Sequence, residues 1–121
     1  MSAKGIVVTT DNKIRVQEFD EPLYKSIGKV VGGWIEIVHP IGLYPPFCMV
    51  VNEEGLLEGL PQNATGSLLY GTQMHGHPIV GNIVILSEEW TPDGYDLVSI
   101  KEDNLQELTQ LLTEAYNLKG E

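Results

Sequence analysis

The sequence has little cysteine and no long hydrophobic run. Cys48 is the only cysteine, so no disulfide can form within the chain, and its apolar neighbours Phe47 and Met49 favour a buried, unreactive thiol. No stretch approaches the roughly 20 apolar residues that a membrane-spanning helix needs. The apolar run near the N-terminus ends at Thr9, which is too short for the core of a signal peptide. We therefore expect a soluble, intracellular protein.

The motifs of common catalytic and cofactor sites are also missing. The chain contains no G-x-S-x-G nucleophile elbow, no H-E-x-x-H or C-x-x-C metal motif, and no G-x-x-x-x-G-K-[ST] or G-x-G-x-x-G phosphate loop. Pairs of carboxylates occur at Glu53-Glu54 and Glu88-Glu89, but adjacent side chains point in different directions. We expect a non-enzymatic protein without a cofactor.

The histidines allow a metal site but do not require one. His75 and His77, two residues apart, can project together from an extended segment, and His39 would complete a three-histidine set of the kind that binds zinc. The alternative is a polar loop in which Gly76 and Pro78 set the turn before a strand. Without a recognised zinc spacing, the sequence favours the loop and predicts no metal.

Positive charge is scarce and unevenly placed. Residues 1–50 hold five acidic and five basic residues, whereas residues 51–121 hold twelve acidic and two basic residues and so carry the whole formal net charge of −10. Such a surface repels phosphates, which excludes direct nucleic-acid binding. It can solubilise the protein, attract a basic partner, or imitate a nucleic acid on a nucleic-acid-binding protein. An interaction surface is predicted at Glu88, Glu89, Asp93 and Asp96.

The length and the hydrophobic pattern predict one α+β domain over residues 1–121, built around an antiparallel or mixed sheet. The run Ile79–Leu86 is aliphatic on both faces and should be a central strand. Asp11-Asn12 should form the turn between the first two strands, and Gly55 is expected to adopt positive φ in a later turn. The predicted strands are Lys4–Thr9, Lys13–Phe19, Trp34–His39, Phe47–Asn52, Ile79–Leu86 and Tyr95–Ile100.

Two short helices and a C-terminal amphipathic helix complete the predicted fold. The first should start at an Asp20 N-cap and end at Gly28 or Gly32-Gly33, and the second, Asn63–Tyr70, should start at an Asn63 N-cap and end at Gly71. The third should start at Asn104, which forms a capping box with Glu107, and end before Gly120. Its apolar residues at helical spacing are Leu105, Leu108, Leu111, Leu112 and Ala115.

Glycine-rich turns are the residues from which a ligand pocket could be built. Backbone amides freed by glycines can hold a phosphate, and a nearby aromatic ring can stack on a base, although the same glycines can serve only as turn residues. The loop Ile41–Pro46 with its flanking residues is either an exposed docking surface or a lid on the core. If the pocket forms, the ligand-binding residues should be Trp34, Tyr44, Asn52, Tyr70, Gly71, Thr72, His75, Gly81 and Asn82.

Four segments resemble a known family. They are residues 31–38 (VGGWIEIV), 50–57 (VVNEEGLL), 59–63 (GLPQN) and 78–82 (PIVGN). Together they resemble a family of short domains of unknown function that is common in bacteriophages, plasmids and other bacterial mobile elements. The resemblance covers about residues 5–86. The C-terminal strand and helix, residues 93–118, lie outside the resemblance. The helix would serve packing or dimerisation.

The resemblance implies a role against host defence in the cytoplasm of a bacterium. One expectation is a homo-oligomeric binding protein that sequesters a small nucleotide-like signalling ligand. The alternative is an acidic nucleic-acid mimic that inhibits a basic host protein involved in nucleic-acid binding or defence. Both expectations are non-enzymatic and involve no membrane.

Overall fold

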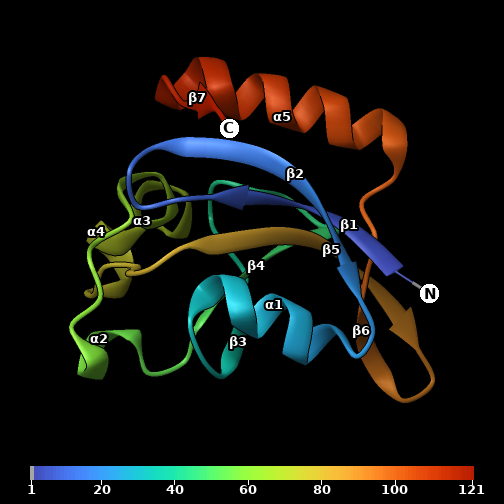
Figure 1. The fold of residues 1–121 in the computed structure, drawn as a ribbon. Coiled ribbons are helices and arrows are strands. Elements are labelled where there is room, and N and C mark those ends of the chain that lie inside the picture. Colours follow the sequence, from blue (N-terminus) through green and yellow to red (C-terminus); the bar gives the residue numbers. More distant parts are fainter. Residues whose placement is uncertain (1) are drawn as a thin grey trace.

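The computed structural model describes residues 2–121, which form a seven-stranded mixed sheet with helices on both faces (Figure 1). The strand order is β3-β4-β5-β1-β2-β7, and β6 pairs with the end of β5. The β2–β7 pairing is parallel and the other pairings are antiparallel. The strands are β1 (Ser2–Val8), β2 (Lys13–Asp20), β3 (Ile35–Val38), β4 (Phe47–Asn52), β5 (Ile83–Thr91), β6 (Gly94–Val98) and β7 (Lys119–Gly120). The helices are α1 (Leu23–Val31), α2 (Gly55–Glu58), α3 (Ala64–Tyr70), α4 (Thr72–His75) and α5 (Glu102–Tyr116). The α+β single domain is therefore confirmed.

The strand β5 is the centre of the sheet, as its aliphatic run predicts. Its first half pairs with β4 on one side and β1 on the other, and residues 83–87 are all buried. Side chains of successive residues point to opposite faces. A continuous apolar run is therefore required, because both faces of this strand are covered.

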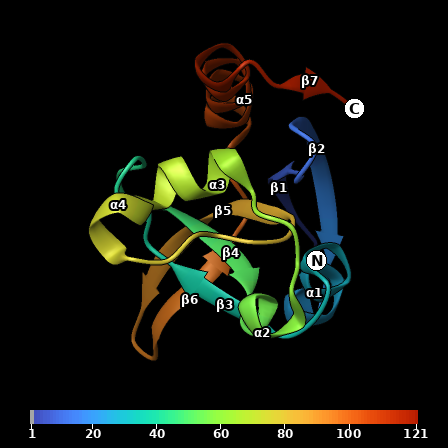
Figure 2. The same ribbon diagram turned by 90° about the vertical axis from the view of Figure 1, so that its left-hand side faces the viewer.

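Two hydrophobic clusters lie on the two faces of the sheet. The larger cluster holds Leu69 of α3 and Leu108 and Leu112 of α5. The smaller cluster holds Ile27 and Val31 of α1. Figure 2 shows α3 and α5 on the side of the sheet away from α1. The sheet is thus the middle layer, and the long C-terminal helix is part of the core.

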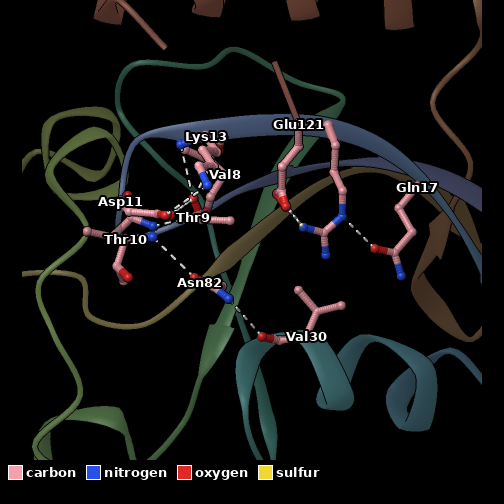
Figure 3. A network of polar contacts seen from close by, with 11 residues as sticks. Val8, Thr9, Thr10, Asp11, Lys13, Gln17, Val30, Asn82 and Glu121 are labelled. Carbon is pink, nitrogen blue, oxygen red and sulfur yellow. Dashed lines mark hydrogen bonds and ion pairs between the residues drawn. The ribbon is translucent and has the colours of Figure 1, made fainter. Parts of the chain in front are cut away.

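Polar contacts fix the β1–β2 turn and the C-terminus (Figure 3). Asn12 adopts positive φ (64°), and the Thr9 hydroxyl hydrogen-bonds the Asp11 carboxylate, which lowers the pKa of Asp11. The predicted turn at Asp11-Asn12 is therefore confirmed. Near the same end of β2, Arg15 Nη1 donates to both carboxylate oxygens of Glu121, at 2.6 and 3.1 Å.

Two predicted helix starts are wrong. Asp20 is the last residue of β2, paired with Ser2 of β1, so it is not an N-cap; α1 begins at Leu23 behind Pro22 without a side-chain cap. Similarly, α5 begins at Glu102, and Asn104 lies inside its first turn. In the first case, the pairing of Asp20 with Ser2 extends β2 to this residue, so Asp20 cannot cap the helix. The predicted Asn63 start of α3 is confirmed, because its side chain accepts a hydrogen bond from the Gly66 amide.

Two predictions around glycines are also wrong. Gly55 does not adopt positive φ. It is the first residue of α2, where a Cβ would lie 2.7 Å from Val80 Cγ2, so close packing rather than turn geometry selects glycine at this position. The central strand starts at Ile83 rather than Ile79. Gly81, at φ 79°, turns the chain just before it, and Val80 forms only an isolated bridge with Gln62.

The C-terminal helix is confirmed, but its buried face is narrower than predicted. Leu105, Leu108 and Leu112 are buried, whereas Leu111 is 55% exposed and Ala115 is also exposed. The helix ends at Asn117 in the left-handed conformation, so Gly120 is not the cap and instead lies in β7. No helix within residues 2–121 has both the length and the apolar character that crossing a membrane requires.

Candidate functional site

The predicted ligand-binding residues do not form one pocket. Asn52 and Tyr70 line the same groove, but Gly71 and Thr72 line a different one beside Ile41, and exposed Tyr44 packs near α5. The remaining members are Trp34, which is exposed before β3, His75, at the end of α4, and Gly81 and Asn82, which precede β5. The glycine turns are thus distributed around the sheet.

The two candidate asparagines hold elements together. Asn52 is buried: its Nδ2 donates to Val31 O (3.2 Å) and Glu58 Oε1 (3.0 Å), and its Oδ1 accepts from the Glu54 amide (2.8 Å). Asn82 Oδ1 accepts from the Thr10 amide (3.1 Å), while its Nδ2 donates to Val30 O at 3.5 Å (Figure 3). Both amides are therefore occupied by the protein itself.

The groove around Tyr70 has a volume of about 140 Å³ and lies between the β3–β4 edge, α2 and the segment that follows α4. We call it the Tyr70 groove. The Tyr70 ring stacks on His75 with centroids 4.3 Å apart, and its hydroxyl lies 3.2 Å from His77 Nε2. Two carboxylates, Glu36 and Glu53, also line the groove, together with apolar residues and no Lys or Arg. This lining suits a ring or an amino group better than a phosphate.

The histidines lie in two places. His39 Nε2 is hydrogen-bonded to the Glu88 carboxylate, whereas His75 and His77 both contact the Tyr70 ring. Within residues 2–121, no group of three or more His, Cys, Asp or Glu side chains is arranged to hold a metal ion. The sequence left His77 out of the predicted site, although its position in the loop beside Tyr70 brings it into the groove.

The acidic residues of the predicted interaction surface lie on the β5–β6 hairpin, residues 83–98. Figures 1 and 2 show that this hairpin extends beyond the rest of the sheet, away from α5. Glu89 and Asp96 are directly opposite each other in its register, and both are exposed. At the tip, Asp93 precedes Gly94, whose φ of 114° closes the turn. Thr91 Oγ1 donates to the Gly94 carbonyl at 2.7 Å and orders the tip.

The next pair along the hairpin is aromatic and lies on the opposite face from the carboxylate pair. Trp90 and Tyr95 are opposite each other, with ring centroids 5.2 Å apart in an edge-to-face arrangement. Their exposed fractions are 69% and 66%. No sequence motif pointed to them, although their symmetric placement about the Pro92-Asp93 turn is a signal that could have found them. The hairpin thus exposes two large rings and two facing carboxylates.

A cavity of about 260 Å³ lies next to the hairpin. We call it the Glu88 pocket; its lining residues are His39, Leu43, Pro45, Pro46, Phe47, Glu88 and Tyr95. The Glu88 side chain is only 11% exposed and pairs with the exposed His39 ring. Its backbone amide donates to Pro46 O at 2.8 Å, which ties the loop to the hairpin. The Ile41–Pro46 loop is therefore one wall of a pocket rather than only a lid.

Cys48 is buried beside this pocket, as the sequence predicts. Burial raises the pKa of the thiol to about 12, and the neighbouring Glu88 carboxylate contributes in the same direction by repelling the thiolate. Because the thiolate is the reacting form, we expect iodoacetamide to alkylate the native protein at pH 8 roughly a hundredfold or more slower than the unfolded chain. Mass spectrometry with and without denaturant measures this ratio, and equal rates would contradict the assignment.

Comparisons with known proteins place the chain in a family. No curated protein matches it in sequence. A crystal structure of the small RNA methyltransferase HEN1 is similar to it, with a TM-score of 0.55 and 12% identity over 87% of this chain. The matched part is only 15% of that methyltransferase chain, and at 12% identity the likeness concerns the fold alone. A family model matches residues 3–113, which extends the matched region beyond the quoted motifs into β6 and α5. The chain therefore belongs to the family described as domain of unknown function DUF3846.

Proposed function

We propose that the protein is a non-enzymatic interaction protein whose β5–β6 hairpin binds a basic surface of another protein. The observation that carries this proposal is the exposed hairpin, which presents the facing Glu89–Asp96 pair on one side and the exposed rings of Trp90 and Tyr95 on the other. Like charges directly opposite each other weaken a strand pair. A partner that encloses the hairpin, with Lys or Arg at the carboxylates on one side and apolar contacts to the rings on the other, would relieve the repulsion and bury the apolar surface. Aromatic residues are enriched in such interfaces.

The charge distribution supports the same function. Residues 51–121 carry the whole net charge of −10, and the hairpin lies in this half. A field of one sign attracts a basic partner over a distance of about one Debye length, so we expect association to slow as salt is added. Direct nucleic-acid binding remains disfavoured, because the same field repels phosphates.

The repulsion in the hairpin has a measurable effect on stability. We expect Glu89→Thr and Asp96→Thr each to raise the free energy of unfolding by about 0.2–1 kcal/mol, because each removes the facing charge. The double variant should gain less than the sum of the two, since the repulsion is removed only once. Urea unfolding of the four proteins gives this coupling. Additive or destabilising effects would show that the pair carries no repulsion.

Purification from the bacterial host with variants of the hairpin tests the function. We expect the wild type to co-purify with a basic protein at low salt. The double variant Trp90→Ala, Tyr95→Ala should no longer retain that protein, and neither should the double variant Glu89→Gln, Asp96→Asn. The matched control is Glu107→Gln with Glu114→Gln, which removes the same charge from exposed positions of α5 and should retain the partner. A partner that survives both hairpin changes would contradict the proposal.

The biological setting is part of the proposal and rests on the resemblance of the four sequence segments. In this setting the protein comes from a phage or mobile element, acts in the bacterial cytoplasm, and inhibits a host defence or nucleic-acid-binding protein as an acidic mimic. Competition distinguishes mimicry from other binding: excess duplex DNA should displace the protein from its partner. A partner that binds DNA and this protein at the same time would contradict mimicry.

Sequestration of a small nucleotide-like ligand by a homo-oligomer is the second candidate function. The observation that favours it is the Tyr70 ring beside the carboxylates of Glu36 and Glu53, which can accept hydrogen bonds from the amino group of a base. Nucleosides that carry an amino group should raise the melting temperature, since a ligand that binds only the folded state stabilises it. Tyr70→Ala should abolish the effect and Tyr44→Ala should not. A screen of nucleosides and nucleotides without any stabilisation would contradict this candidate.

A further inference from the structure

The Glu88 pocket combines apolar walls with one nearly buried carboxylate. Leu43, Pro45, Pro46 and Phe47 form its walls from the loop side, and Tyr95 lines it from the hairpin. Phe47 is fixed by an edge-to-face contact with Tyr44, with centroids 6.1 Å apart. The walls are held in place by the hydrogen bond between the Glu88 amide and Pro46 O. The cavity is therefore part of the folded structure rather than a gap between loops.

The charge of Glu88 is only partly matched by the protein. A carboxylate has about four lone-pair sites for hydrogen bonds. Among residues 2–121, the Glu88 carboxylate is hydrogen-bonded to His39 Nε2, and no Lys or Arg forms an ion pair with it. The His39 side chain is 71% exposed, so it lies at the open side and can move away without disturbing the core. Glu89 and Asp96 add further negative charge to the same hairpin.

We propose that the Glu88 pocket receives the side chain of an arginine presented by the partner protein. This inference rests on the proposed function, because the partner is the basic protein that the hairpin binds. A guanidinium is planar, weakly hydrated and able to pair with a carboxylate through two parallel hydrogen bonds, and it stacks on aromatic rings. Lysine fits less well, because its compact ammonium is strongly hydrated and would lose more on entering apolar walls. Arginine displaces His39 from Glu88 and packs against Tyr95.

Titration by nuclear magnetic resonance with N-acetyl-arginine methylamide tests this inference without knowledge of the partner. We expect the signals of the Tyr95 ring and of residues around Phe47 and Glu88 to shift, with a Kd on the order of millimolar for so small a probe. The citrulline analogue has the same shape without the charge and should produce no such shifts. The lysine analogue should bind several-fold more weakly. Equal shifts with citrulline, or lysine binding as tightly as arginine, would overturn the proposal.

Two variants and a matched control locate the bound guanidinium. Glu88→Gln should weaken binding of the arginine probe roughly tenfold or more, because the charge-assisted hydrogen bonds are lost. Tyr95→Ala, at a largely exposed position that tolerates truncation, should weaken it several-fold through loss of the ring. Glu107→Gln removes one charge from an exposed position of α5, outside the hairpin, and should leave the affinity within about twofold. Loss of binding in Glu89→Gln but not in Glu88→Gln would place the arginine outside the pocket and overturn the proposal.

The two proposals fail in different ways. If the arginine probe does not bind while the hairpin variants still lose the partner, the pocket inference alone is wrong. If the probe binds in the pocket while those variants keep the partner, the proposed function is wrong.

Discussion

Asn63→Ala is expected to lower the free energy of unfolding by about 4 kcal/mol. Asn63 is fully buried, and its side chain makes three hydrogen bonds: Nδ2 donates to Val8 O and Gly81 O, both at 3.0 Å, and Oδ1 accepts from the Gly66 amide at 2.8 Å. Alanine would leave two buried carbonyls and one helix N-terminal amide without partners. Since small domains are stable by only about 5–15 kcal/mol, this loss should be evident in urea unfolding.

Asn63→Asp separates the two roles of this side chain. Aspartate keeps the acceptor that caps α3 but replaces the donor with an oxygen that faces the carbonyls of Val8 and Gly81. We expect the aspartate variant to be destabilised as strongly as the alanine variant. Gln110→Ala, at an exposed position of α5, is the control and should change stability by less than about 0.5 kcal/mol. An aspartate variant as stable as the wild type would show that Asn63 acts only as a helix cap.

Gly5→Val is expected to lower the free energy of unfolding by about 3 kcal/mol. From β-propensity alone, valine should suit this position, because Gly5 lies within β1 and weakens a strand. In the folded protein, however, a Cβ on Gly5 would lie 2.8 Å from Ile85 O and 2.9 Å from Leu86 Cδ2. The backbone carbonyl of the central strand β5 cannot move without breaking its ladder. Valine therefore forces two central strands apart.

Gly120→Val is the matched control for this prediction. Gly120 also lies in a strand, β7, but nothing lies within 4 Å of the position where its Cβ would be. We expect this variant to unfold within about 0.5 kcal/mol of the wild type. Thermal and urea unfolding compare the two variants directly. If Gly5→Val is as stable as Gly120→Val, the close approach of β1 to β5 is not maintained in solution.

Much of the fold follows from local sequence patterns. The β-branched runs in β1 and β4 and the leucine spacing in α5 bury one or both faces in the expected way, because strand and helix periods decide which side chains share a face. The Asn63 cap is likewise a local signal. The start of β5 at Ile83 and the buried face of α5 depend on the neighbouring elements. Leu111, for example, is apolar and has helical spacing but is 55% exposed.

The candidate sites were less predictable than the fold. Glycine-rich turns suggest a single ligand pocket, but the order of the strands places these turns at different points around the sheet. The side-chain amides of the two asparagines bind the protein itself: Asn52 joins β4 to α1, and Asn82 joins the segment before β5 to the β1–β2 turn. The acidic residues of the hairpin were selected by charge alone. Their register, and the aromatic pair on the opposite face of the hairpin, became visible only when β5 and β6 were paired.

The sequence by itself determined the α+β domain, the central aliphatic strand, the burial of Cys48 and the acidity of the second half. Each of these depends on composition or on a period of a few residues. Only the tertiary structure distinguished Glu88 from Glu89. These identical neighbours point to opposite faces of β5, so one lies nearly buried in a pocket and the other faces Asp96 in solvent. The difference arises because the loop from His39 to Phe47, distant in sequence, covers one face of the hairpin and not the other.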